Sequence, residues 1–241
     1  SDQIVITEIP YGVIKADMVQ HIGNLVNEKR LEGISNIFDY SNHEGMRIVI
    51  KLKRDANANV VLNKLYKETA LQSSFSINNI ALVNGRPELL NLRRLIACFV
   101  EHRHEVVTRR SQFELRKAEE RAHLVEGLII ASDNIDEVVA IIKSSKTVQE
   151  AIERLMSRFG LTEIQARYVV DMQLRQLTGL MQEKLRAELA ALYETINRLK
   201  ELLANKELRM NLIKEELLEV KDKYGDERRT QIVYASEEFN P

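Results

Sequence analysis

Eight basic side chains between residues 93 and 121 are the densest group in this chain that could do chemistry, because lysine and arginine contact phosphates. They are Arg93, Arg94, Arg103, Arg109, Arg110, Arg116, Lys117 and Arg121. Glutamates are interleaved with them, and Glu105–Arg109 and Arg116–Glu120 have the four-residue spacing at which opposite charges stabilise a helix. We therefore interpret this group as a solvated helix face rather than as a phosphate site.

Tyr168 has the neighbour most suggestive of nucleophilic catalysis, since it follows Arg167, and an arginine beside a tyrosine can activate it toward phosphate. However, Ala166, Val169 and Val170 place it in a short amphipathic helix, so we interpret Tyr168 as a structural residue. The sequence has no Gly-rich phosphate loop and no visible Ser-His-Asp or Cys-His pattern. We assign no catalytic residue.

The histidines and the single cysteine do not predict a metal site. His102 and His104 are two residues apart and would point to different sides of a helix, and no acidic residue at ligand spacing completes a site. Cys98 has apolar neighbours and is expected to be buried. We therefore assign no metal ligand and no cofactor to this chain.

Composition limits the class of protein. The chain has 241 residues, is 44% hydrophobic and 29% charged, and carries a formal net charge of -1, so we expect a folded, soluble protein. It contains neither an apolar run long enough for a membrane span nor a signal segment, and we expect it to be cytoplasmic. It starts without an initiator methionine, which suggests that it begins inside a longer protein.

Residues 1–90 are predicted to form a small α+β layer. β-branched runs, turn clusters and helical spacing alternate in the order β-α-β-β-α-β, with the last strand over residues 74–83. Strand alternation would place Lys51 and Lys53 on one side, with Leu52 opposite.

Helical patterns dominate after Asn91, which is a good N-cap residue. No glycine or proline interrupts residues 92–126. Near the C-terminus, positions spaced by four and three are apolar with one exception, Lys206, which predicts a continuous helix of about 60 Å packed against a partner helix. The positions are Leu185, Leu189, Leu192, Ile196, Leu199, Leu203, Lys206, Met210, Ile213, Leu217, Val220 and Tyr224.

Residues 133–181 break into short helices. Thr147 with Glu150, and Thr162 with Gln165, fit capping boxes, and Gly160 is placed to end the helix between them. The fold class predicted is α+β, mainly α: a small α+β part followed by a long antiparallel coiled-coil hairpin with a helical globule at its tip. A compact apolar run in that globule is either an interface or plain core. It consists of Met172, Leu174, Leu177, Leu180 and Met181.

Several stretches resemble the A subunits of bacterial type IIA topoisomerases, and DNA gyrase more than its paralogue, topoisomerase IV. They include I-V-I-T-E-I-P-Y at 4–11, E-G-I-S-N at 32–36, G-M-R-I-V-I-K-L-K-R-D-A at 45–56, A-L-V-N-G-R-P at 81–87, E-V-V-T-R-R at 105–110, F-E-L-R-K-A-E-E-R-A-H at 113–123, L-T-G-L at 177–180 and D-E-R-R-T at 226–230. The likeness covers nearly the whole chain.

The resemblance implies a division of the chain. Residues 1–90 would be the later part of the tower domain that flanks the gate DNA, and 91–132 and 182–225 would be the two coiled-coil arms. Residues 133–181 would be the exit-gate globule, and 226–241 a tail toward a DNA-wrapping domain. It implies that Lys51, Lys53 and Arg54 contact DNA, with a solvated strand edge as the alternative, and that the apolar run in the tip forms a dimer interface.

The resemblance also implies what lies elsewhere. The family's nucleophilic tyrosine belongs to an upstream domain that no stretch here resembles, so Tyr168 does not inherit the role. The ATP and Mg²⁺ sites would belong to the B subunit. Expected partners are double-stranded DNA, the B subunit, and another copy of the chain's own parent, but no membrane. From the residues alone, two other classes stay open: a coiled-coil adaptor protein, and an RNA-binding arm like those of some synthetases.

Overall fold

The computed structural model describes residues 2–172 and 179–234. The chain forms two compact units, residues 1–79 and 80–241. Most of the described residues are helical and the strands are few and antiparallel, which confirms the predicted α+β, mainly α class.

The first unit is an antiparallel sheet with two helices packed on one face. Its elements are β1 (Gln3–Ile6), α1 (Lys15–Asn27), β2 (Ile34–Asp39), β3 (Ile48–Leu52) and α2 (Ala58–Glu68). The strand order is β1-β3-β2, with Ile4 opposite Ile50 and Phe38 opposite Val49. Alternation along β3 directs Ile48, Ile50 and Leu52 toward the helices. There they join Met18, Ile22 and Leu25 of α1 and Val61 and Leu65 of α2 in the core.

The predicted sixth element forms a strand, but the strand is shorter than expected and does not belong to this layer. Regular strand structure in the expected 74–83 segment covers only β4 (Asn79–Val83), which pairs with β5 (Arg86–Leu90) in a separate two-stranded sheet. Asn84 and Gly85 between them both have positive φ, at 52° and 79°. Two such residues favour a tight hairpin turn that returns the chain onto the strand it has just left.

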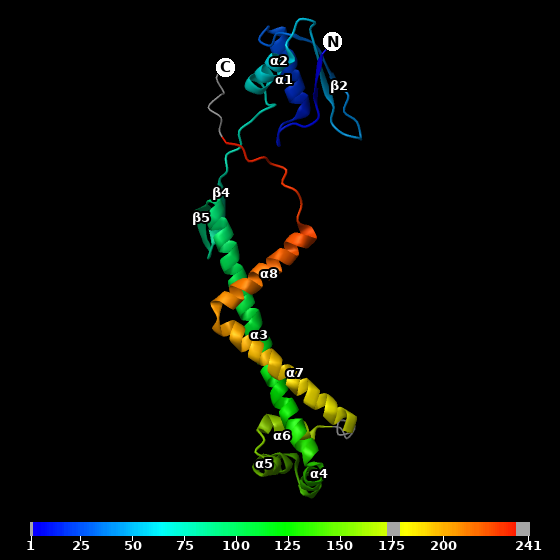
Figure 1. The fold of residues 1–241 in the computed structure, drawn as a ribbon, viewed down its shortest axis with the longest axis vertical. Coiled ribbons are helices and arrows are strands. Elements are labelled where there is room, and N and C mark those ends of the chain that lie inside the picture. Colours follow the sequence, from blue (N-terminus) through cyan, green and yellow to red (C-terminus); the bar gives the residue numbers. More distant parts are fainter. Residues whose placement is uncertain (1, 173–178, 235–241) are drawn as a thin grey trace. The chain divides into compact units, whose positions relative to one another are not determined.

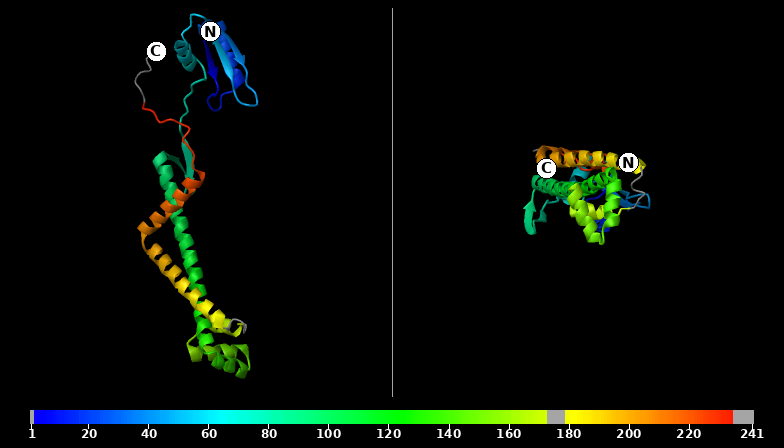
Figure 2. Two further views of the ribbon diagram at one scale, coloured as in Figure 1. Left: turned by 45° about the vertical axis from the view of Figure 1, so that its right-hand side comes forward. Right: turned by 90° about the horizontal axis from the view of Figure 1, so that it is seen from below.

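The second unit is built on α3 (Leu92–Asp133), a helix of 42 residues and about 63 Å. Asn91 caps it by accepting a hydrogen bond from the Arg94 backbone N–H. After the tip helices the chain returns through α7 (Gly179–Ala204) and α8 (Lys206–Tyr224). Figures 1 and 2 show α7 running back beside α3 in the opposite direction, as the antiparallel hairpin prediction requires.

The return arm is not the single helix predicted from the seam. It breaks at Asn205, whose side-chain oxygen accepts hydrogen bonds from the backbone N–H groups of Glu207 and Leu208 and so starts a new helix. Lys206 is the first residue of α8, so the one polar seam position coincides with the break. The seam is buried at Leu199 and Ile213, on either side of the break, but exposed at Val220 and Tyr224.

The tip consists of α4 (Ile135–Ser144), α5 (Val148–Phe159) and α6 (Glu163–Val170). Thr162 and Gln165 form the predicted capping box, and Gly160 ends α5 with φ of 68°. At Thr147 only half of the box forms, because the Glu150 carboxylate accepts from the Lys146 N–H rather than from Thr147.

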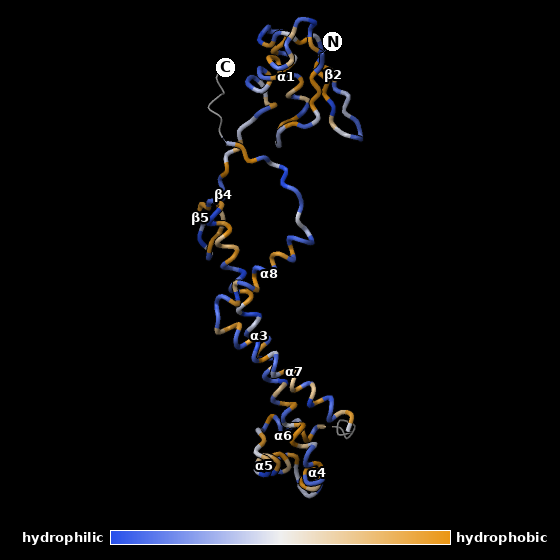
Figure 3. The backbone as a smooth tube through the Cα atoms, in the orientation of Figure 1, coloured by the Kyte–Doolittle hydropathy of each residue, from blue (hydrophilic) through white to orange (hydrophobic). Residues whose placement is uncertain are grey.

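Buried apolar residues from α3, α4, α5, α6 and α7 give the tip its own core. They include Val125, Leu128, Val138, Ile152, Leu155, Val169 and Leu185. Figure 3 shows apolar segments on the tip helices where they meet α3. Gly127 permits the close approach of α6, since a Cβ there would lie 2.9 Å from the Gln165 Cβ.

Candidate nucleic-acid and subunit interfaces

The predicted DNA-contact residues Lys51, Lys53 and Arg54 are all exposed at the C-terminal end of β3. Leu52 between the two lysines is only 3% exposed, as the alternation predicts. The Lys51 ammonium lies 5.0 Å from the centroid of the Phe38 ring, on the sheet face opposite the helices, and Phe38 stacks on Tyr40. The face of the ring attracts the ammonium group through a cation–π interaction, and the lysine keeps its positive charge.

Lys53 contributes to a different surface, an open depression of about 540 Å³ that is also lined by Lys29 and Lys64. The three ammonium groups come from the turn after α1, the end of β3 and helix α2. None of them forms an ion pair with another described residue. Glu32 and Asp55 line the same depression, so its charged lining has a net charge of +1, three lysines against two acids.

Backbone geometry determines where two of these lysines branch from the chain. The Lys53 N–H donates to the Gly33 carbonyl at 2.7 Å, and Lys29 has a φ of 60°. Gly33 itself has φ of 91°, and a Cβ there would press on Ala56 and Val61 at 3.0 and 3.1 Å. Sequence reasoning missed Lys29 and Lys64, because nothing in their local patterns shows that the two segments meet at the end of β3.

The predicted dimer-interface residues have different environments in the tip. Met172 is partly buried against the tip core, Met181 is partly buried, and Leu180 is 64% exposed. Leu174 and Leu177 lie outside the described residues. Two further apolar side chains of the tip are exposed, Val148 at 60% and Ile164 at 65%.

Tyr168 is partly buried and packs against the tip core, in keeping with its interpretation as a structural residue. With Leu124, Arg167 and Asp171 it lines a shallow depression of about 330 Å³. It also lies close to Arg121, whose pKa is raised above its ordinary value, chiefly by the hydrogen bond to Glu188 and then by Tyr168.

Arg103, Arg110 and Arg121 of α3 form ion pairs with the returning arm rather than with their own helix. Neither Glu105–Arg109 nor Arg116–Glu120 is an ion pair, which corrects the expected source of helix stabilisation. Arg121 instead donates to Glu188 of α7 at 2.6 Å. A charged side chain on a helix can reach a neighbouring helix as easily as the next turn of its own helix. Spacing in the sequence reveals only the pairs within one helix.

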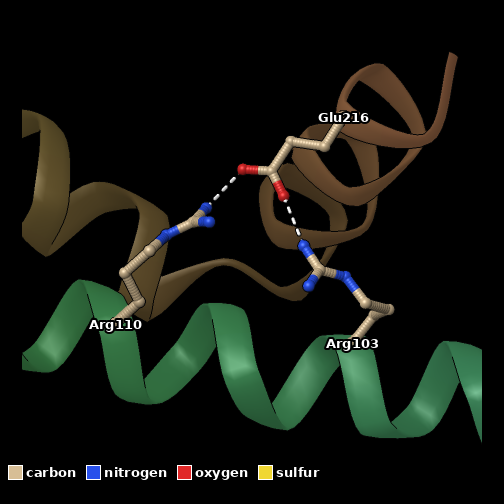
Figure 4. Close-up of polar contacts among 3 residues, drawn as sticks. All are labelled: Arg103, Arg110 and Glu216. Carbon is tan, nitrogen blue, oxygen red and sulfur yellow. Dashed lines mark hydrogen bonds and ion pairs between the residues drawn. The ribbon is translucent and has the colours of Figure 1, made fainter. Parts of the chain in front are cut away.

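Glu216 of α8 bridges two turns of α3, as Figure 4 shows. One carboxylate oxygen accepts from Arg103 at 2.8 Å and the other accepts from Arg110. Side-chain exposure is 28% for both Glu216 and Arg103, so this group, the Glu216 clamp, is partly shielded from water.

Arg209 stabilises the junction between α7 and α8. Its guanidinium donates to the carbonyls of Leu202 and Leu203, at 3.2 and 2.7 Å, which satisfies acceptors at the end of α7. Its Nε also donates to His104 of α3 at 3.0 Å. Apart from the polar seam position Lys206, the sequence signalled neither the break nor this contact.

Within residues 2–172 and 179–234, no group of three or more His, Cys, Asp or Glu side chains is arranged to hold a metal ion. No helix in the described part of the chain is long and apolar enough to cross a membrane.

Comparison with known proteins gives the family. Residues 1–218 match the family model of the DNA gyrase/topoisomerase IV A subunit. The chain is 49% identical to the DNA gyrase A subunit of Clostridium acetobutylicum over 238 residues, which are 99% of this chain and 29% of that protein. The corresponding gyrase protein from Halalkalibacterium halodurans is 49% identical over 98% of this chain and 28% of its own length.

The DNA gyrase A subunit of Staphylococcus aureus (strain MRSA252) is 48% identical over 95% of this chain and 26% of its own length. The chain thus spans less than a third of the length of these relatives. With the match extending over most of its residues, this chain belongs to the family of DNA gyrase/topoisomerase IV A subunits.

Proposed function

We propose that this chain is a structural, non-catalytic part of a DNA gyrase A subunit. The parent enzyme would cut both strands of one duplex, pass a second duplex through and reseal, introducing negative supercoils at the expense of ATP. ATP and Mg²⁺ would be bound by the B subunit, and the assembly, with two A subunits, would work in the cytoplasm. Membership of the family supports this proposal.

The observation that carries the proposal is the length of the helical arm in the second unit. Helix α3 runs about 63 Å from its start at Leu92 to the tip, and α7 returns beside it. An arm of this length would hold the tip well away from the start of α3 and leave a cavity large enough for a duplex. The tip would then meet its copy in the other half of the dimer and close the exit from that cavity.

The exit gate would use Leu180, Met172 and Met181, together with Leu174 and Leu177. Since the tip has its own buried core, the exposed Leu180 is not needed to stabilise it and is free to serve an interface. A gate that must open in every cycle calls for a modest interface, so few apolar side chains suffice.

DNA contact would involve Lys51, Lys53 and Arg54, with Lys29 and Lys64 added because they share the depression with Lys53. Because Lys29, Lys53 and Lys64 form no ion pair with another described residue, no ion pair has to break before they neutralise phosphates. Each phosphate neutralised on a duplex contributes about 0.9 to the slope of log affinity against log salt concentration.

The experiment replaces Lys29, Lys53 and Lys64 by glutamine in the full-length parent protein and measures binding to a DNA duplex over a range of salt. We expect weaker binding and a salt slope smaller by up to about 2.7. Lys67→Gln, on the exposed face of α2 outside the depression, is the matched control. An unchanged slope in the triple variant would remove the depression from the proposed DNA path.

The alternative within the family is the topoisomerase IV A subunit, which the family model includes. The complete protein with its B subunit would decide: net negative supercoiling of relaxed plasmid supports gyrase, whereas relaxation without supercoiling supports topoisomerase IV. The isolated chain is expected neither to cleave nor to relax DNA.

A further inference from the structure

The sheet of the first unit has one face that its own helices leave open. Helices α1 and α2 pack on the side that receives Ile48, Ile50 and Leu52, and Figure 1 shows both helices on the same side of the strands. Alternation directs the intervening residues to the opposite side, which we call the open sheet face. They are Gln3, Val5, Asn36, Phe38, Val49 and Lys51.

Two aromatic rings lie on the open sheet face. Phe38 and Tyr40 are two residues apart, and their rings are stacked, with centroids 5.6 Å apart and planes inclined by 14°. Val49, the cross-strand partner of Phe38, is only 3% exposed, whereas Tyr40 is 52% exposed. The first unit therefore covers the apolar side chain on this face and still leaves the ring of Tyr40 largely open to solvent.

The charge of the open sheet face is positive. The Lys51 ammonium lies 5.0 Å from the centroid of the Phe38 ring, and it forms no ion pair with another described residue. The only acidic residue within β1, β2 and β3 is Asp39, which pairs with Lys15 of α1 at 2.9 Å on the helix side of the sheet. No carboxylate from the three strands therefore repels a phosphate at this face.

Stacked rings with a free lysine beside them have the chemistry that holds unpaired bases. Any base can stack on an aromatic ring, while a basic side chain neutralises a phosphate of the same strand. An antiparallel sheet is a common support for such rings, because alternate residues of one strand present them on one face. In a duplex the faces of each base are covered by the neighbouring base pairs. The open sheet face thus favours a single strand over a duplex.

We propose that the open sheet face binds single-stranded DNA, with a base continuing the stack of Phe38 and Tyr40 and with Lys51 neutralising a phosphate of the same strand. The proposal deepens the DNA contact proposed for Lys51, and its choice of DNA over RNA rests on that proposed function. The stacking itself rests on the rings and the charge of this face. Lys29, Lys53 and Lys64 belong to the depression, so the two surfaces can be tested separately.

The test measures binding of the 241-residue chain to a fluorescein-labelled oligothymidylate of about 12 nucleotides by fluorescence anisotropy. Tyr40→Leu removes the exposed ring but keeps an apolar side chain. Tyr66→Leu is the matched control, because Tyr66 is a 42% exposed tyrosine of the same unit that lies in α2, away from the open sheet face. Circular dichroism checks that both variants fold.

We expect Tyr40→Leu to weaken binding at least about fivefold, since each stacked base contributes substantially to affinity, and Tyr66→Leu to change it less than about twofold. Lys51→Gln should reduce the slope of log affinity against log salt concentration by about 0.7, the value for one phosphate of a single strand. Binding to a duplex should be the same for Tyr40→Leu as for the unmodified chain, because paired bases do not reach the ring.

Three outcomes would overturn the proposal. The first is an absence of binding to the oligothymidylate, or an equal effect of Tyr40→Leu and Tyr66→Leu. The second is an equal loss of duplex binding in Tyr40→Leu, which would mean that the ring contacts DNA without stacking on a base. The third is tighter binding of an oligouridylate of the same length, which would assign the face to RNA.

The triple variant of Lys29, Lys53 and Lys64 separates this proposal from the proposed function. Its binding to the oligothymidylate should equal that of the unmodified chain, because none of the three lysines lies on the open sheet face. An unchanged salt slope on duplex DNA in that variant would count against the depression alone. A loss of oligothymidylate binding equal to that of Tyr40→Leu would overturn the assignment to the open sheet face.

Discussion

Replacing Glu216 by glutamine tests whether the clamp holds α8 on α3. The substitution keeps the shape of the side chain but removes the charge that Arg103 and Arg110 share. Exposed ion pairs contribute about 0.2–1 kcal/mol each, and hydrogen bonds to charged groups more when water is partly excluded. With Glu216 and Arg103 both 28% exposed and Arg110 at 39%, we expect a loss of about 1–2 kcal/mol for the two contacts.

The assay is thermal unfolding followed by far-ultraviolet circular dichroism, which reports mainly on the helical second unit. For a chain of this size a loss of 1 kcal/mol lowers Tm by about 2–4 °C, so Glu216→Gln is expected to lower it by about 2–8 °C. Glu219→Gln is the matched control, because Glu219 pairs only with Lys223 of its own helix among the described residues. The control should change stability by less than about 0.5 kcal/mol.

Two outcomes would refute this reasoning. Equal Tm values for Glu216→Gln and Glu219→Gln would show that the clamp adds nothing beyond a surface pair. A difference that persists unchanged at about 1 M salt, where the Debye length is about 3 Å, would show that the loss is not electrostatic. A double-mutant cycle with Arg103→Gln should give a coupling energy of at least about 0.5 kcal/mol.

Three further predictions concern the break, the tip and the first unit. Asn205→Ala removes both bonds that start α8 and should cost about 1 kcal/mol in chemical denaturation, whereas Asn211→Ala, exposed within α8, should cost nothing. Gly127→Ala should lower the free energy of unfolding by about 1–3 kcal/mol although alanine is the better helix former, because the new Cβ would lie 2.9 Å from Gln165. Gly23→Ala in α1, where a Cβ would have nothing within 4 Å, should raise it instead. The reverse order would refute the close-approach argument. Hydrogen bonds from Ser41, and then Lys15, lower the pKa of Asp39 from 3.8 to about 2. The carboxylate's contribution to stability is therefore present above pH 4 and lost as pH falls toward 2. Ser41→Ala should raise the pKa of Asp39 in an NMR titration, and an unshifted midpoint would contradict the assignment.

Local signals in the sequence predicted much of the helical framework. Asn91, Thr162 and Gly160 have the capping roles that their residue types favour, since each cap needs only a few neighbouring backbone groups. The apolar spacing from Leu185 onward predicted a helix packed against a partner, and the short helices over 133–181 predicted that this helix would return along the first arm. These features depend on residues close in sequence.

What the sequence did not reveal depends on contacts between distant segments. Asn205 lies between seam positions, and the four-and-three spacing runs through it unchanged, so periodicity concealed a break made by one side-chain oxygen. Arg209 and Glu216 become informative only when α3 is beside them.

The candidate DNA surface shows the same limit. The resemblance to the topoisomerase A subunits identified Lys53 as a candidate, but Lys29 and Lys64 reach it only through the fold of the first unit. The proposed gate residues were only partly predictable. Composition singled out the run from Met172 to Met181, and the structure places Met172 against the core and Leu180 in solvent.

Sedimentation equilibrium of the 241-residue chain tests most directly whether the tip is a gate between two copies. We predict a reversible dimer for the unmodified chain, weakened at least tenfold by Leu180→Asp and unaffected by Leu218→Asp, which places the same charge at an exposed leucine of α8. A monomer at all concentrations, or a dimer that both substitutions leave unchanged, would contradict the account of the tip as the exit gate.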